Sequence, residues 1–107
     1  MSKLNRFGIM MAGATMFAGA TSFAQSGEAI YKAKCQSCHG AAGIPSPGMA
    51  KAMGVKPITD PAVMKSSEAE MIKATENGTG KMRPYKGQLS DAEIKASVEY
   101  FRSFMKK

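Results

Sequence analysis

Two cysteines and a histidine lie within five residues, Cys35-Gln36-Ser37-Cys38-His39, and this motif limits the folds open to the chain. Because residues i and i+3 lie on one face of a helical turn, both thiols can reach the vinyl groups of a single porphyrin. A histidine directly after the second cysteine can turn its imidazole under that ring and coordinate the iron. The motif therefore predicts covalent attachment of one c-type haem through Cys35 and Cys38, with His39 as an axial ligand.

Cysteines at this spacing also occur in zinc sites and in redox dithiols. A closed zinc site needs four ligands, and the chain contains two cysteines and one histidine in total, so carboxylates would have to complete it. A thioredoxin-like dithiol is expected within a βαβ pattern, and no strands alternate with helices here. Haem attachment is favoured, and a haem-free thiol-disulfide protein is the alternative.

The first 24 residues have the pattern of a signal peptide. Lys3 and Arg6 give a positive start, residues 7–23 carry no charge, and Ala24 ends a stretch of small residues suited to a peptidase. A membrane anchor is the alternative, but the segment is short for a span of about 20 residues and is diluted by glycine, serine and threonine. We expect cleavage after Ala24, no stable membrane insertion afterwards, and one mature domain over residues 25–107.

The mature domain has 83 residues, a length at which an apolar core alone gives marginal stability. A covalent haem offers the helices a large apolar body to pack against, so we expect the chain without haem to fold poorly. Without Lys3 and Arg6, 13 basic residues oppose 8 acidic ones. This excess favours redox partners with acidic docking faces, whereas scattered lysines argue against nucleic-acid binding.

The pattern of helix signals predicts an all-α domain. A helix is expected over residues 26–38, because Tyr31, Cys35 and Cys38 then share one face. Residues 40–61 are rich in glycine and proline, which predicts a loop with at most a short helix over residues 49–53.

The remaining chain carries three helix starts. Asp60-Pro61 indicates a cap and a first helical residue for one short turn. Capping boxes at Ser67-Glu70 and at Ser90-Glu93 open two longer helices. The first of these is expected to end before Gly78, and the second to run to the end of the chain. An apolar stripe marks the inner face of the last helix: Ile94, Val98, Phe101 and Met105.

Residues 77–87 lie between the two capped helices, and their glycines and proline exclude a regular helix. Met82 is in this loop, where its thioether can be directed at the iron without leaving a helical core position. Met71 and Met105 are expected to fill the core, whereas Met49 and Met53 are candidates for the wall of the haem pocket. We therefore predict Met82 as the second axial ligand, over the competing methionines: Met49, Met53, Met64, Met71 and Met105.

Together these features resemble the small monohaem class I cytochromes c of the short bacterial kind. The resemblance covers nearly all of the mature chain. It implies about three main helices and short turns wrapped around one covalent haem, with the first and last helices crossing closely. Its motifs are Cys35 to Gly40, Gly80-Lys81-Met82 with Pro84-Tyr85, and Leu89 to Lys95, and its helix contacts pair Gly27 and Tyr31 with Tyr100 and Val98.

The ligand set and the resemblance also imply a function. With His39 and Met82 as axial ligands the iron has no open position, which favours a one-electron carrier and not an enzyme. The signal-peptide pattern of residues 1–24 places this carrier in the periplasm, and we expect it to be a monomer. The alternative is a haem-based sensor or enzyme subunit with a labile sixth ligand, and a subunit of a larger dehydrogenase or oxidase is also compatible.

The family pattern also suggests residues around the ligands. Its downstream proline carbonyl accepts the Nδ1 proton of the histidine, and Pro45 is the candidate over Pro47. Ser97, Glu99 and Arg83 depart from the family pattern, which bears on packing and on the docking face. Three cations are expected at the haem edge or on ordinary solvated surface: Lys81, Arg83 and Lys86.

Overall fold

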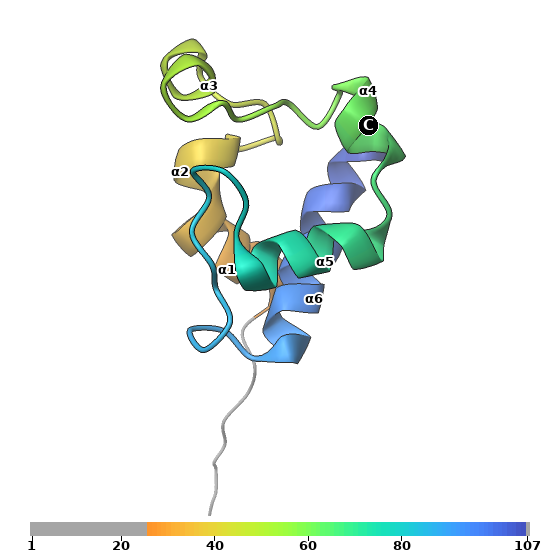
Figure 1. Cartoon of the computed structure of the whole chain (residues 1–107). Helices are drawn as coiled ribbons and strands as arrows, with labels where there is room; N and C mark the ends of the chain where they lie inside the picture. The colour runs from red at the N-terminus through yellow and green to blue at the C-terminus, as the bar shows by residue number, and fades with distance from the viewer. Residues whose placement is uncertain (1–25, 107) are drawn as a thin grey trace, which may run out of the picture.

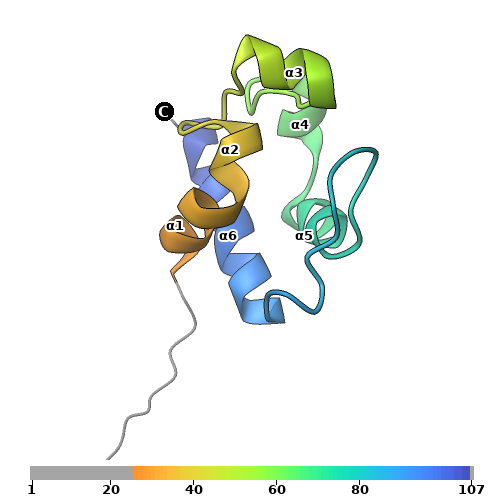
Figure 2. The same ribbon diagram turned by 90° about the vertical axis from the view of Figure 1, so that its left-hand side faces the viewer.

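The computed structural model describes residues 26–106, which form the all-α domain that the sequence predicts (Figures 1 and 2). The predicted signal peptide and its cleavage site lie outside these residues. Within the described part, the only β-type pairings are isolated bridges between Thr79 and Met82 and between Lys86 and Leu89. Every helix found there is too short or too polar to cross a bilayer.

The first helical stretch consists of α1 (Gly27–Ile30), a π-helical turn (Tyr31–Cys35) and α2 (Gln36–His39). The predicted regular helix over residues 26–38 is therefore wrong in its middle, where the N–H of Gln36 donates to the carbonyl of Tyr31. A π turn inserts one residue, and each residue of a helix turns the chain by about 100°. The side chains after the turn consequently face a different direction from those of α1.

Two short helices follow in the glycine- and proline-rich segment. They are α3 (Pro47–Met53) and α4 (Pro61–Lys65), capped by the side chains of Ser46 and Asp60. Each begins with a proline, whose fixed φ suits a first helical residue. The short helix expected over residues 49–53 thus starts two residues earlier, while the turn predicted at Asp60-Pro61 is confirmed.

Both capping boxes form as predicted and open the two longest helices. α5 (Glu68–Asn77) begins after Ser67, and α6 (Asp91–Ser103) begins after Ser90. α5 ends at Gly78, whose φ of 77° suits glycine. α6 passes into a 3-10 turn (Phe104–Lys106), so the α-helix ends slightly before the expected point.

α1 crosses α6 so closely that a side chain at Gly27 has no space. A Cβ at this position would overlap the carbonyl oxygen of Ala96. The ring of Tyr31 lies 5.4 Å from that of Tyr100, as the family pattern implies. Val98 belongs to the buried cluster that contains Ile30 of α1, together with Leu89 and Ile94.

The apolar core is small for a domain of this length. Among the described residues, six hydrophobic side chains are buried. Four of them form the cluster beneath the α1–α6 crossing, and the other two are Tyr31 and Ile58. This core leaves the space between α2, α5 and α6 to be filled by something other than side chains.

The close crossing predicts that replacing glycine by alanine changes the stability of the protein differently at two positions, Gly27 and Gly48. Gly27→Ala is expected to destabilise the protein by about 1–3 kcal/mol, because the backbone of α6 must move away. Gly48→Ala, within α3 and with no neighbouring atom within 4 Å, is the control and should be neutral or stabilising by about 0.5–1 kcal/mol. Denaturant unfolding of both variants measures this, and equal shifts would contradict the close crossing.

Candidate haem-binding site

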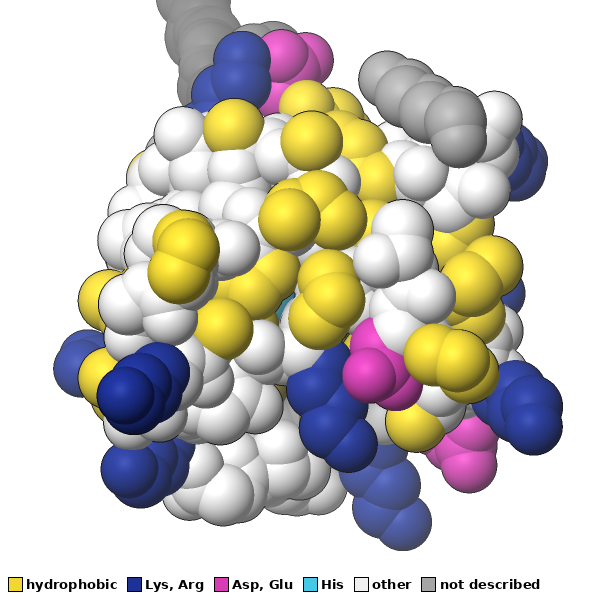
Figure 3. Space-filling view, turned by 90° about the horizontal axis from the view of Figure 1, so that it is seen from above, with side chains coloured by type: hydrophobic (Ala, Val, Ile, Leu, Met, Phe, Trp, Pro, Cys, Tyr) yellow, Lys and Arg dark blue, Asp and Glu magenta, His cyan; other side chains and the backbone are white. Residues whose placement is uncertain are grey.

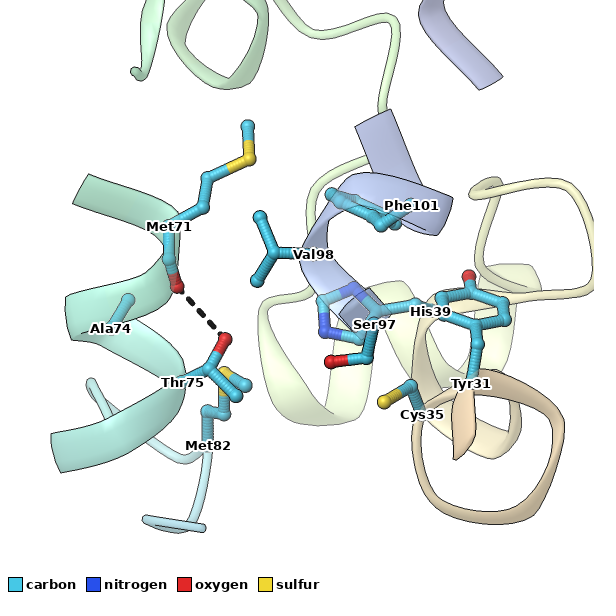
Figure 4. Close-up of a pocket in the computed structure, with 10 residues that line it drawn as sticks. All are labelled: Tyr31, Cys35, His39, Met71, Ala74, Thr75, Met82, Ser97, Val98 and Phe101. Atoms are coloured by element: carbon cyan, nitrogen blue, oxygen red, sulfur yellow. Dashed lines mark hydrogen bonds between the residues drawn. The ribbon is translucent and has the colours of Figure 1, made fainter. Parts of the chain in front are cut away.

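Two adjoining cavities, of about 550 and about 120 Å³, lie between the helices. The larger is within the range of about 300–1,000 Å³ typical of ligand pockets. All four predicted site residues line it, and all except Cys38 also line the smaller one. In Figure 4, Met71, Ala74 and Met82 come from one side of the pocket, and Cys35 and His39 come from the other. The structure thus brings the predicted residues together around one space.

Cys35 stands where the π turn meets α2, and Cys38 lies within α2. Burial, and to a lesser degree the neighbouring Cys38, raises the pKa of the Cys35 thiol to about 11. A redox-active dithiol needs the opposite shift, because the thiolate is its nucleophile. This environment therefore disfavours the thiol-disulfide alternative.

His39 is the last residue of α2, and its ring meets that of Phe101 edge-on, with centroids 5.2 Å apart. Burial lowers the pKa of His39, so the imidazole is neutral at pH 7, the form that coordinates metals. Its Nδ1 is buried and has no hydrogen-bond partner.

The predicted bond from His39 Nδ1 to the carbonyl of Pro45 is therefore wrong for this structure. The chain makes a turn directly after Gly40, in which the N–H of Gly43 donates to the Gly40 carbonyl at 3.2 Å. That carbonyl also accepts from the hydroxyl of Tyr31 at 2.6 Å. Tyr31 thus fixes the backbone next to His39, and the ring itself is held by packing against Phe101.

Met82 lies at the end of a tight turn formed by residues 79–82. Thr79 and Met82 exchange two backbone hydrogen bonds, of 3.2 and 2.7 Å, and Gly80 between them has a φ of 53°. The chain then returns to the end of α5, where the N–H of Tyr85 donates to the carbonyl of Thr75 at 2.9 Å. These bonds hold Met82 at the cavity without a helix.

The other methionines differ from the expectations in two respects. Met71 does pack against the core, but it also lines both cavities and is thus a second thioether on the same wall as Met82. Its Sδ accepts a long hydrogen bond of 3.7 Å from Nη1 of Arg102. Met53 lines the larger cavity as expected, whereas Met49 is not among the lining residues.

Sequence reasoning did not place two buried polar residues in the pocket, Thr75 and Ser97, although Ser97 was noted as a departure from the family pattern. Thr75 donates to the carbonyl of Met71 at 2.8 Å, and Ser97 donates to that of Ile94 at 2.9 Å. Both hydroxyls are satisfied within their own helices, so the lining stays apolar. Spacing could have identified Thr75, since it lies four residues after Met71 on α5 and therefore on the same face.

The mouth of the larger cavity is positively charged. Four cations line it, and no carboxylate occurs among its lining residues. Figure 3 views the face over α3 and α4, where apolar side chains gather and several lysine and arginine side chains, with a few acidic ones, lie around them. Of the three predicted edge cations, Lys81 and Arg83 line the cavity and Lys86 does not. The four lining cations are Lys34, Lys56, Lys81 and Arg83.

These residues fit a haem. The space is large and mainly apolar, two thiols lie on one helical turn at its edge, and a neutral imidazole and a thioether approach from different walls. A helical domain with this site defines the class of small single-haem cytochromes c.

Comparisons with known proteins agree with this class. The chain belongs to the family described as cytochrome c oxidase, cbb3-type, subunit III, whose model matches residues 22–101. It is similar to the solved structure titled "KustC0563 c-type cytochrome", with 30% identity and a TM-score of 0.67, covering 75% of this chain and 98% of that one. A solved structure of a point mutant of Kustc0563 is 29% identical, with a TM-score of 0.66, 75% coverage of this chain and 99% of that one. No curated protein matches significantly.

The chain is thus a haem-based electron-transfer protein that uses haem c. The thioether and ligand roles of Cys35, Cys38, His39 and Met82 remain predictions.

Proposed function

We propose that this protein is a periplasmic one-electron carrier with one haem c, attached through Cys35 and Cys38 and ligated by His39 and Met82. The observation that carries the proposal is that these four side chains line one mainly apolar cavity. Met82 does so although it lies far along the sequence from the other three. When bound, the haem supplies a reversible ferric/ferrous couple.

The chain's own residues determine how that couple behaves. Cys35 and Cys38 would hold the haem through thioether bonds, and His39 and Met82 would each supply a ligand to its iron, which would leave no position for a substrate. Phe101, Val98 and Ala74 line the smaller cavity with apolar groups, which would limit the access of water to a bound haem. A soft thioether and an apolar shell both favour the ferrous state, so the reduction potential is raised relative to a bis-histidine haem.

The charged mouth of the cavity supports transient docking of partners with acidic faces, because opposite charge accelerates encounter. The proposed location rests on the leader pattern of residues 1–24. A second role, as a bound oxidase subunit, is favoured by the description of the matched family. Size-exclusion chromatography of the native protein distinguishes the two, because a free monomeric carrier elutes as a single small chain.

The ligand assignment predicts different spectra for two methionine variants. The oxidised wild-type protein should show the weak far-red sulfur-to-iron band, and Met82→Ala should lose it. Met71→Leu is the matched control: Met71 lines the same cavity, but its sulfur already interacts with Arg102, so the band should remain. Optical spectra of the purified haem-loaded proteins provide the measurement.

The converse pattern, with the band lost in Met71→Leu and retained in Met82→Ala, would move the ligand to α5. Haem absorption without a far-red band in the wild-type protein would instead support the sensor or enzyme alternative. A colourless protein would refute the proposal as a whole.

If partners dock at the cavity mouth, reversing the charge of a lysine there should slow electron transfer to an anion more than reversing the charge of a lysine elsewhere. Lys56→Glu at the cavity mouth should slow oxidation of the ferrous protein by the ferricyanide anion by roughly three- to tenfold at low salt. Lys73→Glu on α5, which does not line the cavity, changes the net charge equally and should slow it less. Stopped-flow rates at two ionic strengths measure the effect, which salt should diminish. Equal rates for the two variants would contradict docking at the mouth.

A further inference from the structure

One hydrogen bond connects the turn that carries Met82 with the opposite rim of the larger cavity. The rim is formed by a strap, which we define as residues 44–66 and which contains α3 and α4. Nζ of Lys81 donates to the carbonyl of Ala52 at 2.9 Å, across 29 positions of sequence. Within residues 26–106, no other hydrogen bond joins residues 79–82 to the strap.

The carbonyl of Ala52 is suited to this role. It belongs to the last turn of α3, whose final carbonyls have no partner inside the helix. The C-terminal end of a helix also carries partial negative charge, which favours a cation. Lys81 therefore meets an acceptor that is available and polarised.

Other hydrogen bonds hold the loop of the turn to α5 and to the first helical stretch. Backbone bonds from Tyr85 and Lys86 reach the carbonyls of Thr75 and Glu76 on α5, at 2.9 and 3.1 Å. The hydroxyl of Tyr85 donates to the carbonyl of Lys34 at 3.2 Å. Just before the turn, the N–H of Gly78 donates to the carbonyl of Ala74 at 2.7 Å, so both ends of the turn are bonded to α5. Among residues 26–106, the bond from Lys81 is the hydrogen bond that joins the turn to the strap.

Lys81 and Met82 both line the larger cavity, as do Met53, Val55 and Lys56 of the strap. The bond from Lys81 therefore spans the cavity mouth directly beside the predicted ligand. A movement of the Met82 turn away from α3 would break this bond.

We propose that Lys81 is a positioning residue whose bond to the Ala52 carbonyl latches the Met82 turn onto the strap and limits exchange of the Met82 thioether for external ligands. The inference rests on the proposed ligation by Met82. Lys81 acts through the turn and does not itself ligate the iron.

Carbon monoxide binding to the ferrous holoprotein tests the latch, because this ligand must displace the thioether. The set comprises wild type, Lys81→Met, Lys81→Arg, Met82→Ala and the control Lys86→Met. Lys86 belongs to the same loop and has the same charge, but it does not line the cavity. Stopped-flow mixing gives the binding rate, and the far-red band of each oxidised protein reports ligation at rest.

Lys81→Met should retain the far-red band but bind carbon monoxide about three- to tenfold faster than wild type, as expected for loss of one exposed hydrogen bond from a charged donor. Lys86→Met should match wild type. Lys81→Arg keeps a cationic donor and should restore slow binding, which a general loss of stability does not explain.

Equal rates for Lys81→Met and Lys86→Met, with the far-red band and slow binding present in wild type, would refute the latch and leave ligation by Met82 intact. A wild-type protein that binds carbon monoxide as fast as Met82→Ala would refute the ligation and the latch together. The two failures are therefore distinguishable.

Discussion

Direct packing of Gly27 on the backbone of Ala96 sets the relative positions of the first and last helices, and the haem site follows from it. The contact allows α1 to lie directly on α6, which places Tyr31 against Tyr100 and fixes where the first helical stretch ends. Because α6 also carries Phe101, the same crossing places His39 against that ring. The attachment motif thus reaches the cavity through one helix contact that requires glycine.

The small size of the apolar core and the presence of the cavity are related, because the same helices contribute side chains to both. The buried cluster lies beneath the α1–α6 crossing, and the neighbouring space is lined by side chains from the first helical stretch, α5 and α6. A domain of this size gains little stability from its own apolar burial. Filling the cavity with a covalently attached, largely apolar group would complete the core, and folding would then be coupled to cofactor attachment. The same apolar enclosure that stabilises the fold would then also govern the reduction potential of the haem.

Local signals in the sequence predicted the all-α fold class, both bounds of α5 and the start of α6. The two helix starts were predictable because a capping box consists of hydrogen bonds within four residues. The π turn was not predictable in this way. It reconciles two tertiary requirements, Tyr31 facing α6 and Cys35 facing the cavity, that no local pattern encodes. Periodicity also failed to separate core from cavity wall at Met71, since both are apolar surfaces on the inner face of a helix. The gathering of Cys35, Cys38, His39 and Met82 followed from motif spacing and loop composition, but the Pro45 contact depended on loop geometry that the sequence does not fix.

Covalent attachment of one haem through Cys35 and Cys38 underlies every functional proposal made for this protein, and intact-protein mass spectrometry measures it. The native protein is expressed with a haem-attachment system and extracted with acidified organic solvent, which removes haem that is not covalently bound. We predict the mass of residues 25–107 plus one haem, and a chain without attached haem when both cysteines are replaced by serine. A wild-type chain that retains no haem mass after extraction would contradict covalent attachment.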